Sequence, residues 1–287
     1  MILIADSGST KCHWALCDEK GNIISNYKTI GFNPYFINEK KILNHLNESK
    51  LQKEKEKINA VFFYGAGCSS EEKNNIIKKP LKLFFKNANV IIRHDIEAAC
   101  YAMYNNSPNI TCILGTGSNI AHFEGEKIKS NAPSLGFLIG DEASGNYFGK
   151  KLINLYFNNI LPYKLKKLFE KEYETNWEIL MKNIYNNERA NVYLAKFFPF
   201  ITKHKDYTII KDLIYSSLDK FFKIHISSYH NHQKVKVNFI GSVAYYLKDE
   251  IITVAKKYKC NIGCIIQNPI ENLVKYHFRD KQKTSSF

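Results

Sequence analysis

The turn at residues 6–11 has the residue types that bind phosphate. Its six residues are small, hydroxyl-bearing or charged: Asp6, Ser7, Gly8, Ser9, Thr10 and Lys11. A phosphate group needs several backbone N–H groups turned toward it, and Gly8 lets the backbone approach closely. The three hydroxyls add donors, and Lys11 adds a positive charge. The Asp6 carboxylate could hold a hydrated Mg²⁺ ion. An ordinary hairpin turn favours the same residue types, so both interpretations stay open here.

A second turn of this kind lies in the other half of the chain and consists of Gly115, Thr116, Gly117 and Ser118. Each of the two turns lies between apolar runs that predict short strands, and a third strand follows after another polar turn. This repetition predicts a duplicated architecture. Two such turns could bind both ends of a triphosphate, although each could also be a simple hairpin turn.

Asp95 follows a predicted strand at residues 90–93 and precedes a predicted helix at residues 96–104. Functional groups of α/β proteins gather at the carboxyl ends of strands. A carboxylate there could orient a sugar hydroxyl and accept its proton during phosphoryl transfer. The alternative is a helix N-cap, a common position for Asp.

Two more glycine-containing turns precede predicted helices. Residues 136–145 include Asp141 and Glu142, which suit recognition of hydroxyl groups or the capping of a helix. Residues 241–244 follow a predicted strand at residues 235–240, and Gly241 would permit close approach of a flat ring or a phosphate. Residues 145–151 fail the P-loop pattern, because their spacing is short and Ser or Thr does not follow the lysine.

The elements that must position these residues alternate between strand and helix, which predicts an α/β fold. In the first half, helices are predicted at residues 40–57 and 71–85, with a strand at residues 60–64. Residues 141 to 232 are nearly all helical. The remaining predictions are a helix through residue 255, a strand at 261–266, a terminal helix at 270–278 and a polar, unstructured tail from residue 279.

The composition excludes several classes of protein. No apolar run approaches the roughly 18 to 20 residues of a membrane span, which predicts a cytoplasmic protein without membrane contact. The net charge is +14, but lysines are scattered and arginine is scarce, which disfavours nucleic-acid binding. The seven cysteines include no CxxC pair, so a zinc or iron–sulfur site is not expected. Cys12, Cys100 and Cys112 lie in apolar segments and are predicted to be buried thiols.

Taken in order, these segments resemble the acetate and sugar kinase, heat-shock and actin superfamily. The likeness is strongest to the N-acetylglucosamine kinase-like branch of the BadF/BadG/BcrA/BcrD ATPase family. The matching segments span almost the whole chain: residues 6–11, 64–68, 113–118, 138–145, 239–244 and 268–269, with 275–277.

The resemblance implies an ATP-dependent kinase that uses Mg²⁺ and has two ribonuclease-H-like lobes with an interlobe cleft. It assigns Mg²⁺ to Asp6, phosphates to residues 6–11 and 115–118, and adenosine to Gly241, Ser242 and Ala244. It makes Asp95 the base that accepts the sugar proton, and it makes Asn33 and Asp141 sugar contacts, together with Asp95. One departure is the segment at residues 96–100, where related kinases carry a smaller, glycine-containing run.

The first lobe is expected at residues 1–110, completed by a terminal helix at 270–287, and the second at 111–269 with a helical insertion. The favoured function is an amino-sugar kinase that phosphorylates N-acetylglucosamine or a related sugar. The alternatives are an actin-like, activator-type ATPase that drives a protein partner and a scaffold that has lost turnover. No cluster-ligating cysteine pair is evident, which argues against the activator ATPases. The sequence leaves the oligomeric state open, a homodimer included.

Overall fold

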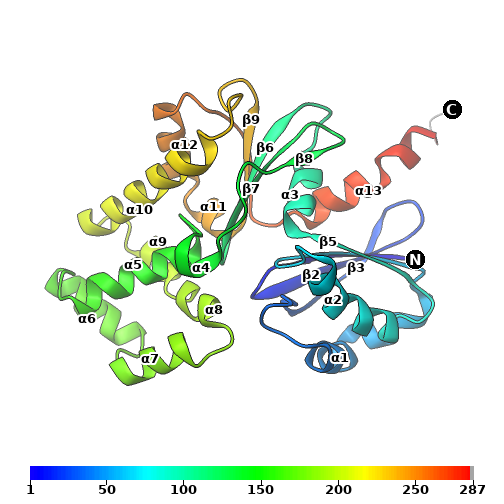
Figure 1. Cartoon of the computed structure of the whole chain (residues 1–287), viewed down its shortest axis with the longest axis horizontal. Helices are drawn as coiled ribbons and strands as arrows, with labels where there is room; N and C mark the ends of the chain where they lie inside the picture. The colour runs from blue at the N-terminus through cyan, green and yellow to red at the C-terminus, as the bar shows by residue number, and fades with distance from the viewer. Residues whose placement is uncertain (285–287) are drawn as a thin grey trace. The chain divides into compact units, whose positions relative to one another are not determined.

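The computed structural model describes the backbone of residues 1–284 and the side chains of residues 1–279. The chain divides into two compact units (Figure 1). The first unit comprises Met1–Pro108, Phe123–Ile128 and Asn268–Phe287, and the second comprises Asn109–His122 and Lys129–Gln267. These bounds differ from the expected ones mainly at residues 123–128. There Phe123 packs against Tyr104 of the first unit, with their ring centroids 5.0 Å apart. Residues 285–287 of the predicted terminal helix lie outside the described residues.

The first unit is built on a five-stranded sheet. Its strands, in the spatial order β3-β2-β1-β4-β5, are β1 (Ile2–Ser7), β2 (Lys11–Cys17), β3 (Ile23–Ile30), β4 (Ala60–Gly65) and β5 (Asn89–His94). β1 pairs antiparallel with β2 and parallel with β4, and β4 pairs parallel with β5. In this register Gly65 lies beside both Ser7 and His94. The segments that follow β1, β4 and β5 therefore begin at one edge of the sheet.

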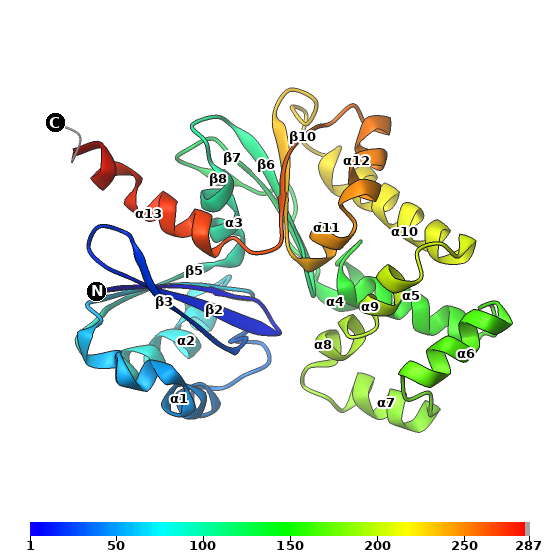
Figure 2. The ribbon, with the colours of Figure 1, turned by 180° about the vertical axis from the view of Figure 1, so that it is seen from behind.

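Helices cover both faces of this sheet. α1 (Glu39–Glu48) and α2 (Glu71–Phe84) pack on one face, where Ile42 and Ile77 join a core with Leu3 and Trp14. α3 (Asp95–Met103) and α13 (Ile270–Thr284) contact each other and the sheet, and Figures 1 and 2 show them on the other face. The strand that ends in His94 thus passes directly into the helix that begins with Asp95.

Two helix predictions in this unit were wrong in extent. The helix predicted at residues 40–57 is broken: α1 ends before Ser49, and the 3₁₀ turns η1 (Lys50–Lys53) and η2 (Lys55–Lys57) follow. The Ser49 hydroxyl donates to the Leu46 carbonyl and accepts from the Leu51 N–H, so these backbone groups are satisfied outside a helix. The terminal helix continues past residue 278 to Thr284, because no glycine or proline interrupts it.

The second unit repeats the strand order of the first. Its strands are β6 (Asn109–Leu114), β7 (Ser118–Phe123), β8 (Ile128–Lys129), β9 (Lys236–Ile240) and β10 (Asn261–Ile266), in the order β10-β9-β6-β7-β8. Read from β8, the strands come third, second, first, fourth and fifth in chain order, which is the order found in the first unit. β9 pairs parallel with β6 and with β10. The α/β class, with two mixed five-stranded sheets, is therefore confirmed.

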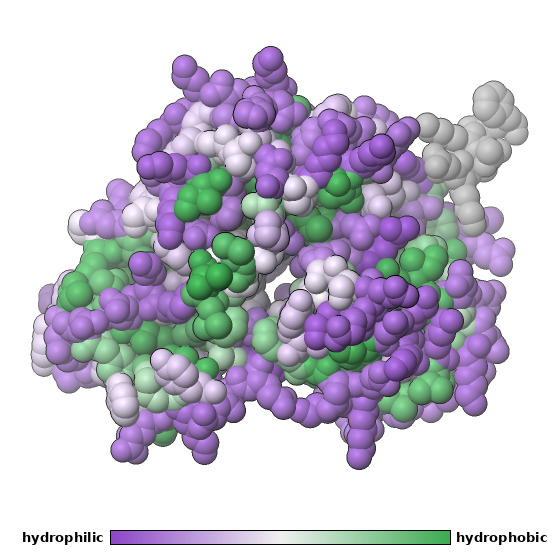
Figure 3. All heavy atoms as spheres, viewed as in Figure 1, coloured by the Kyte–Doolittle hydropathy of each residue, from purple (hydrophilic) through white to green (hydrophobic). Residues whose placement is uncertain are grey.

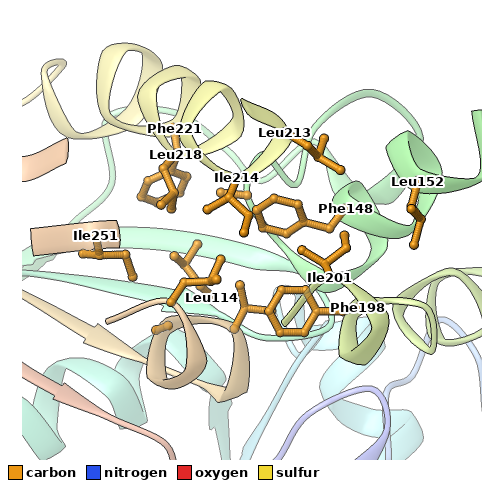
Figure 4. Packing of buried hydrophobic residues seen from close by; sticks show 14 of the residues in the cluster. Leu114, Phe148, Leu152, Phe198, Ile201, Leu213, Ile214, Leu218, Phe221 and Ile251 are labelled. Atoms are coloured by element: carbon orange, nitrogen blue, oxygen red, sulfur yellow. The ribbon is translucent and has the colours of Figure 1, made fainter. Parts of the chain in front are cut away.

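A helical insertion separates β8 from β9. It contains α4 (Gly136–Ile139), α5 (Gly145–Phe157), α6 (Tyr163–Glu172), α7 (Trp177–Tyr185), α8 (Ala190–Ala195), α9 (Phe198–Lys203), α10 (Thr208–Phe221) and the π-helical turn η3 (Phe222–Ile226). After β9, the single helix predicted through residue 255 is instead two helices, α11 (Ser242–Tyr246) and α12 (Lys248–Lys257), which meet at Leu247. In the core of the unit, Phe148 of α5 and Leu218 of α10 pack over Leu114 of β6 (Figure 4).

Hydrophilic side chains cover most of the face shown in Figure 3, but an apolar patch lies over α4. Leu138 and Ile139 of this helix are 75% and 73% exposed. The exposed segment leads directly into the loop that carries Asp141. Among the described residues, no helix combines the length and apolarity that crossing a membrane requires.

Candidate active site

The turn between β1 and β2 closes through a hydrogen bond from the Gly8 N–H to the Lys11 carbonyl at 3.0 Å. A side chain at Gly8 would meet no atom nearer than 3.7 Å, so the backbone there faces open space. Ser7 does not have a free hydroxyl, because its Oγ accepts from the Phe32 N–H at 2.9 Å and the residue is fully buried. The exposed end of this turn carries Thr10 and Lys11. The Gly8 N–H and the Ser7 hydroxyl are therefore both engaged in hydrogen bonds, and the exposed Lys11 side chain is left for an anion.

Asn33 is packed against the same turn. Its Nδ2 donates to Ser9 Oγ at 2.8 Å, and its Oδ1 accepts from the Tyr35 N–H at 3.0 Å. A side chain at Gly67, in the segment after β4, would come within 2.4 Å of this Oδ1. Asn33 is 7% exposed. The segments that follow β1, β3 and β4 therefore meet at the side-chain amide of Asn33.

Two carboxylates of the first unit, those of Asp6 and Asp95, influence each other electrostatically. Burial and the nearby Asp95 charge raise the pKa of Asp6 from 3.8 to about 7, although Lys11 opposes the shift. A carboxylate that is disfavoured as an anion by burial and by a second carboxylate would be stabilised by a bound cation. Asp6 therefore fits the metal role that the resemblance gave it. Among residues 1–279, no group of three or more His, Cys, Asp or Glu side chains forms a metal cluster.

The N-cap interpretation of Asp95 is wrong, because His94 occupies the cap of α3. His94 is the N-cap residue: its Nδ1 lies 3.4 Å from the Ile96 N, and the Glu97 carboxylate accepts from the His94 N–H at 3.1 Å. Arg93 Nη1 holds the same Glu97 carboxylate at 2.9 Å. Asp95 is the first residue of α3 and does not serve as its N-cap.

The Asp95 carboxylate has one close contact. Its buried Oδ1 lies 2.5 Å from His94 Nδ1 and pairs with this ring nitrogen. Burial lowers the pKa of His94, but the hydrogen bond and charge of Asp95 outweigh it, and the pKa is raised overall. The sequence reasoning did not predict the capping contacts of His94 and Glu97. Glu97 belongs to the segment that departs from the family pattern, and the departure was the available signal.

The turn between β6 and β7 is held by the start of α5. The Gly145 N–H donates to the Gly115 carbonyl at 2.8 Å, and both the N–H and the Nδ2 of Asn146 donate to the Thr116 carbonyl at 3.0 and 2.7 Å. A side chain at Gly115 would meet nothing within 4 Å. The space beside the Gly115 Cα is therefore open, although the Gly115 N–H donates to the Gly117 carbonyl at 2.9 Å. Asn146 was missed by the sequence reasoning, because it lies outside every motif.

Asp141 lies in the second unit beside this turn, whereas Asn33 and Asp95 lie in the first unit. Its Oδ1 accepts from the Ser118 N–H at 3.2 Å, and its Oδ2 accepts from Asn146 Nδ2 at 2.6 Å. Burial raises the pKa of Asp141 despite these hydrogen bonds. A side chain at Gly117 would approach the Asp141 carboxylate to 3.0 Å. Asp141 thus braces the glycine-rich turn from within its own unit.

Gly241 lies against the end of β6. Its φ of 120° is a left-handed conformation, and a side chain there would come within 2.3 Å of the Leu114 carbonyl oxygen. Ser242, which starts α11, is partly exposed, but Ala244 is fully buried in the core. The predicted adenosine segment therefore meets the predicted phosphate turn at Gly241, while the Ala244 side chain packs inward.

The cysteines show no sign of metal or disulfide chemistry. All seven are free thiols, and five of them are buried: Cys12, Cys17, Cys68, Cys100 and Cys112. The predicted burial of Cys12, Cys100 and Cys112 is confirmed.

Comparison with solved structures shows similarity along the whole chain. The "putative N-acetylglucosamine kinase" of Porphyromonas gingivalis is 33% identical and superimposes with a TM-score of 0.90, over 98% of this chain and all of that one. A second "putative N-acetylglucosamine kinase", from Chromobacterium violaceum, is 12% identical with a TM-score of 0.62, over 96% of this chain and 98% of that one. A ROK family glucokinase from Streptomyces griseus, solved with glucose and AMPPNP, is 14% identical with a TM-score of 0.58, over 98% and 99%. The last two likenesses show the fold alone.

No protein-family model matches the chain. No curated protein matches it either.

Proposed function

Because the chain belongs to the family of the Porphyromonas gingivalis protein, we propose that it is an ATP-dependent sugar kinase. It transfers the γ-phosphate of ATP to a hydroxyl of N-acetylglucosamine or a related amino sugar. The whole-chain identity to the Porphyromonas gingivalis protein supports the kinase class, and the name of that protein supports the amino sugar.

One observation carries the chemistry: His94 is the N-cap of α3 in place of Asp95, so the Asp95 carboxylate has no capping role and pairs instead with the His94 ring at 2.5 Å. Asp95 accepts the proton of the sugar hydroxyl while the hydroxyl oxygen bonds to the γ-phosphorus and the bond between that phosphorus and ADP breaks. Asn33, tied to the β1–β2 turn through Ser9, and Asp141 orient the sugar.

The nucleotide phosphates are assigned to the turns that contain Gly8 and Gly115, with Lys11 as a positive charge and with open space beside Gly115. Gly241 and Ser242 are assigned to the adenosine. Asp6 would hold Mg²⁺, which when bound neutralises phosphate charge. The raised pKa of Asp6 supports this role, because a cation relieves the unfavourable charge that the shift reports.

The test is an ADP-release assay with N-acetylglucosamine, N-acetylmuramic acid and glucose, comparing the wild type with Asp95→Asn. The variant should lose sugar-dependent turnover by about 100-fold or more, since general-base catalysis contributes that much. Asp212→Asn, an exposed position on α10, is the matched control and should behave like the wild type. A wild type whose ATP turnover no sugar increases would contradict the proposed kinase and favour an ATPase that serves a partner. Full activity in Asp95→Asn would contradict only the assignment of the base.

A further inference from the structure

The loop between α4 and α5 holds two non-glycine residues in the left-handed region. Asp141 has a φ of 59° and Ala143 a φ of 56°. Asp tolerates this conformation, but alanine gains nothing from it, because the methyl group crowds the backbone. Ala143 is fully buried. A strained, buried segment of this kind persists only where its surroundings impose it.

Glu142, between these two residues, is fixed by contacts from another part of the unit. It is 7% exposed, and its carboxylate accepts from His225 Nε2 at 3.0 Å and lies 3.4 Å from Lys220 Nζ. Burial raises the pKa of Glu142, but the hydrogen bond from His225 and the neighbouring charges outweigh it and lower the pKa overall. The buried anion is therefore satisfied, and it ties the loop to α10 and the turn that follows.

His225 reaches Glu142 from a π-helical turn. The Ser227 N–H bonds back to the Phe222 carbonyl at 2.9 Å, five residues earlier, and η3 extends α10 with this wider turn. π-helical turns are rare and often lie at functional sites. α10 itself is anchored in the core by Leu218 and Phe221, which Figure 4 shows packed beneath the helix. The support behind Glu142 is thus rigid.

On its other side the loop braces the glycine-rich turn. The Asp141 carboxylate holds the Ser118 N–H, and Asn146 links that carboxylate to the Thr116 carbonyl. Glu142 therefore fixes one end of the strained loop to α10 and η3, and Asp141, the residue before it, fixes the loop to residues 115–118. The proposed chemistry uses Asp141 and residues 115–118 and leaves Glu142, His225 and Lys220 without a role.

We infer that Glu142, clamped by His225 and Lys220, is a positioning residue that holds the strained loop, and through Asp141 the 115–118 turn, in the arrangement that receives nucleotide phosphate. The inference rests on the proposed function, because it takes that turn to bind phosphate. Glu142 acts at a distance: it holds the backbone that carries Asp141.

The experiment measures binding of AMPPNP with Mg²⁺ by calorimetry and KM for ATP by ADP release. His225→Phe removes the donor to Glu142, and His225→Gln keeps an N–H in a similar place. We expect His225→Phe to weaken AMPPNP binding by about 10- to 100-fold and to raise KM more than it lowers kcat, because small misplacements have effects of this size. His225→Gln should recover most of the loss. Glu170→Gln on α6, where the partly exposed Glu170 pairs with Lys167 at 2.8 Å, controls for the loss of a carboxylate charge and should bind like the wild type.

Equal AMPPNP affinity in His225→Phe and the wild type would overturn the inference, as would equal losses in His225→Phe and His225→Gln. If His225→Phe does not fold, Glu142→Gln and Lys220→Met provide the same measurement with smaller changes, and wild-type affinity in both would overturn it. Failure of the proposed function would instead appear in the wild type, as absence of AMPPNP binding or of sugar-dependent turnover.

Discussion

Replacing Asp6 with asparagine should stabilise the metal-free protein at high pH. The folded pKa of Asp6 is about 7, against an ordinary value of 3.8. Between these two pH values the folded chain keeps a proton that the unfolded chain has released, so the stability of the wild type falls as the pH rises. The asparagine side chain has nearly the same shape as that of Asp6 and no charge, so the Asp6→Asn variant escapes this loss.

The size of the effect follows from the shift. Each pH unit within the window corresponds to about 1.4 kcal/mol. Between pH 5 and pH 8 the wild type should therefore lose about 3 kcal/mol relative to Asp6→Asn, and the difference should be constant above pH 8. Comparing the two proteins at pH 5 and at pH 8 removes any effect of the substitution that does not depend on pH.

Urea unfolding in EDTA, followed by tryptophan fluorescence, measures this difference. Trp14 is fully buried in the core of the first unit, whereas Trp177 is 60% exposed in the second. In a Trp177→Phe background the fluorescence reports the unit that contains Asp6. Asp212→Asn in the same background controls for the Asp-to-Asn exchange on a solvated surface.

The variant should also distinguish the two causes of the shift. Burial is the larger cause and Asp95 the smaller. In an Asp95→Asn background, Asp6→Asn should therefore keep most of its pH-dependent gain. If Asp6→Asn raises the free energy of unfolding equally at pH 5 and pH 8, the reasoning is refuted. If Asp95→Asn abolishes the pH-dependent gain, the Asp95 charge and not burial is the larger cause of the raised Asp6 pKa.

The remaining predictions concern single contacts. Burial, followed by Arg93, lowers the pKa of His277 from 6.5 to about 4, so the unfolded chain takes up the proton first as the pH falls. The wild type should lose about 3 kcal/mol between pH 6.5 and pH 4, and urea unfolding of His277→Gln should show a flatter dependence. Gly241→Ala should lower the free energy of unfolding by about 3 kcal/mol through strain, whereas Gly115→Ala should leave stability unchanged and weaken AMPPNP binding measured by calorimetry. Ala143→Gly should raise the melting temperature, because glycine relieves up to about 1 kcal/mol of left-handed strain; an unchanged or lower value would argue against strain there.

The fold was largely predictable because its signals are local. Short apolar runs around Gly8 and Gly115, each followed by another polar turn, indicated two copies of one strand pattern, and both sheets have it. The helix breaks at Ser49 and Leu247 were not predicted. At Ser49 a hydroxyl satisfies the backbone where the periodicity of the apolar residues continues, so the pattern alone carries no stop signal.

The site was predictable only as far as its residues lie in sequence motifs. Asp95 was found from its place after a strand, but its release from the cap depends on the His94 ring and on Glu97, whose contacts a sequence does not show. Likewise, nothing in the sequence pairs Glu142 with His225, because the pairing depends on a π-helical turn far along the chain. Ser7 shows the converse error: its residue type suits phosphate, but the fold uses its hydroxyl to bind the Phe32 N–H.

The two units repeat one turn but use their carboxylates differently. In the second unit, Asp141 and Glu142 form hydrogen bonds and an ion pair that hold the loop around the turn. In the first unit, neutral groups do this holding, since Asn33 binds Ser9 and Ser7 binds the Phe32 N–H. Burial, followed by the Asp95 charge, raises the pKa of Asp6, which makes Asp6 a carboxylate that a bound cation would stabilise. In the proposed kinase, proton transfer therefore involves Asp95 of the first unit, and the second unit supplies the 115–118 turn, which its own loop holds in place.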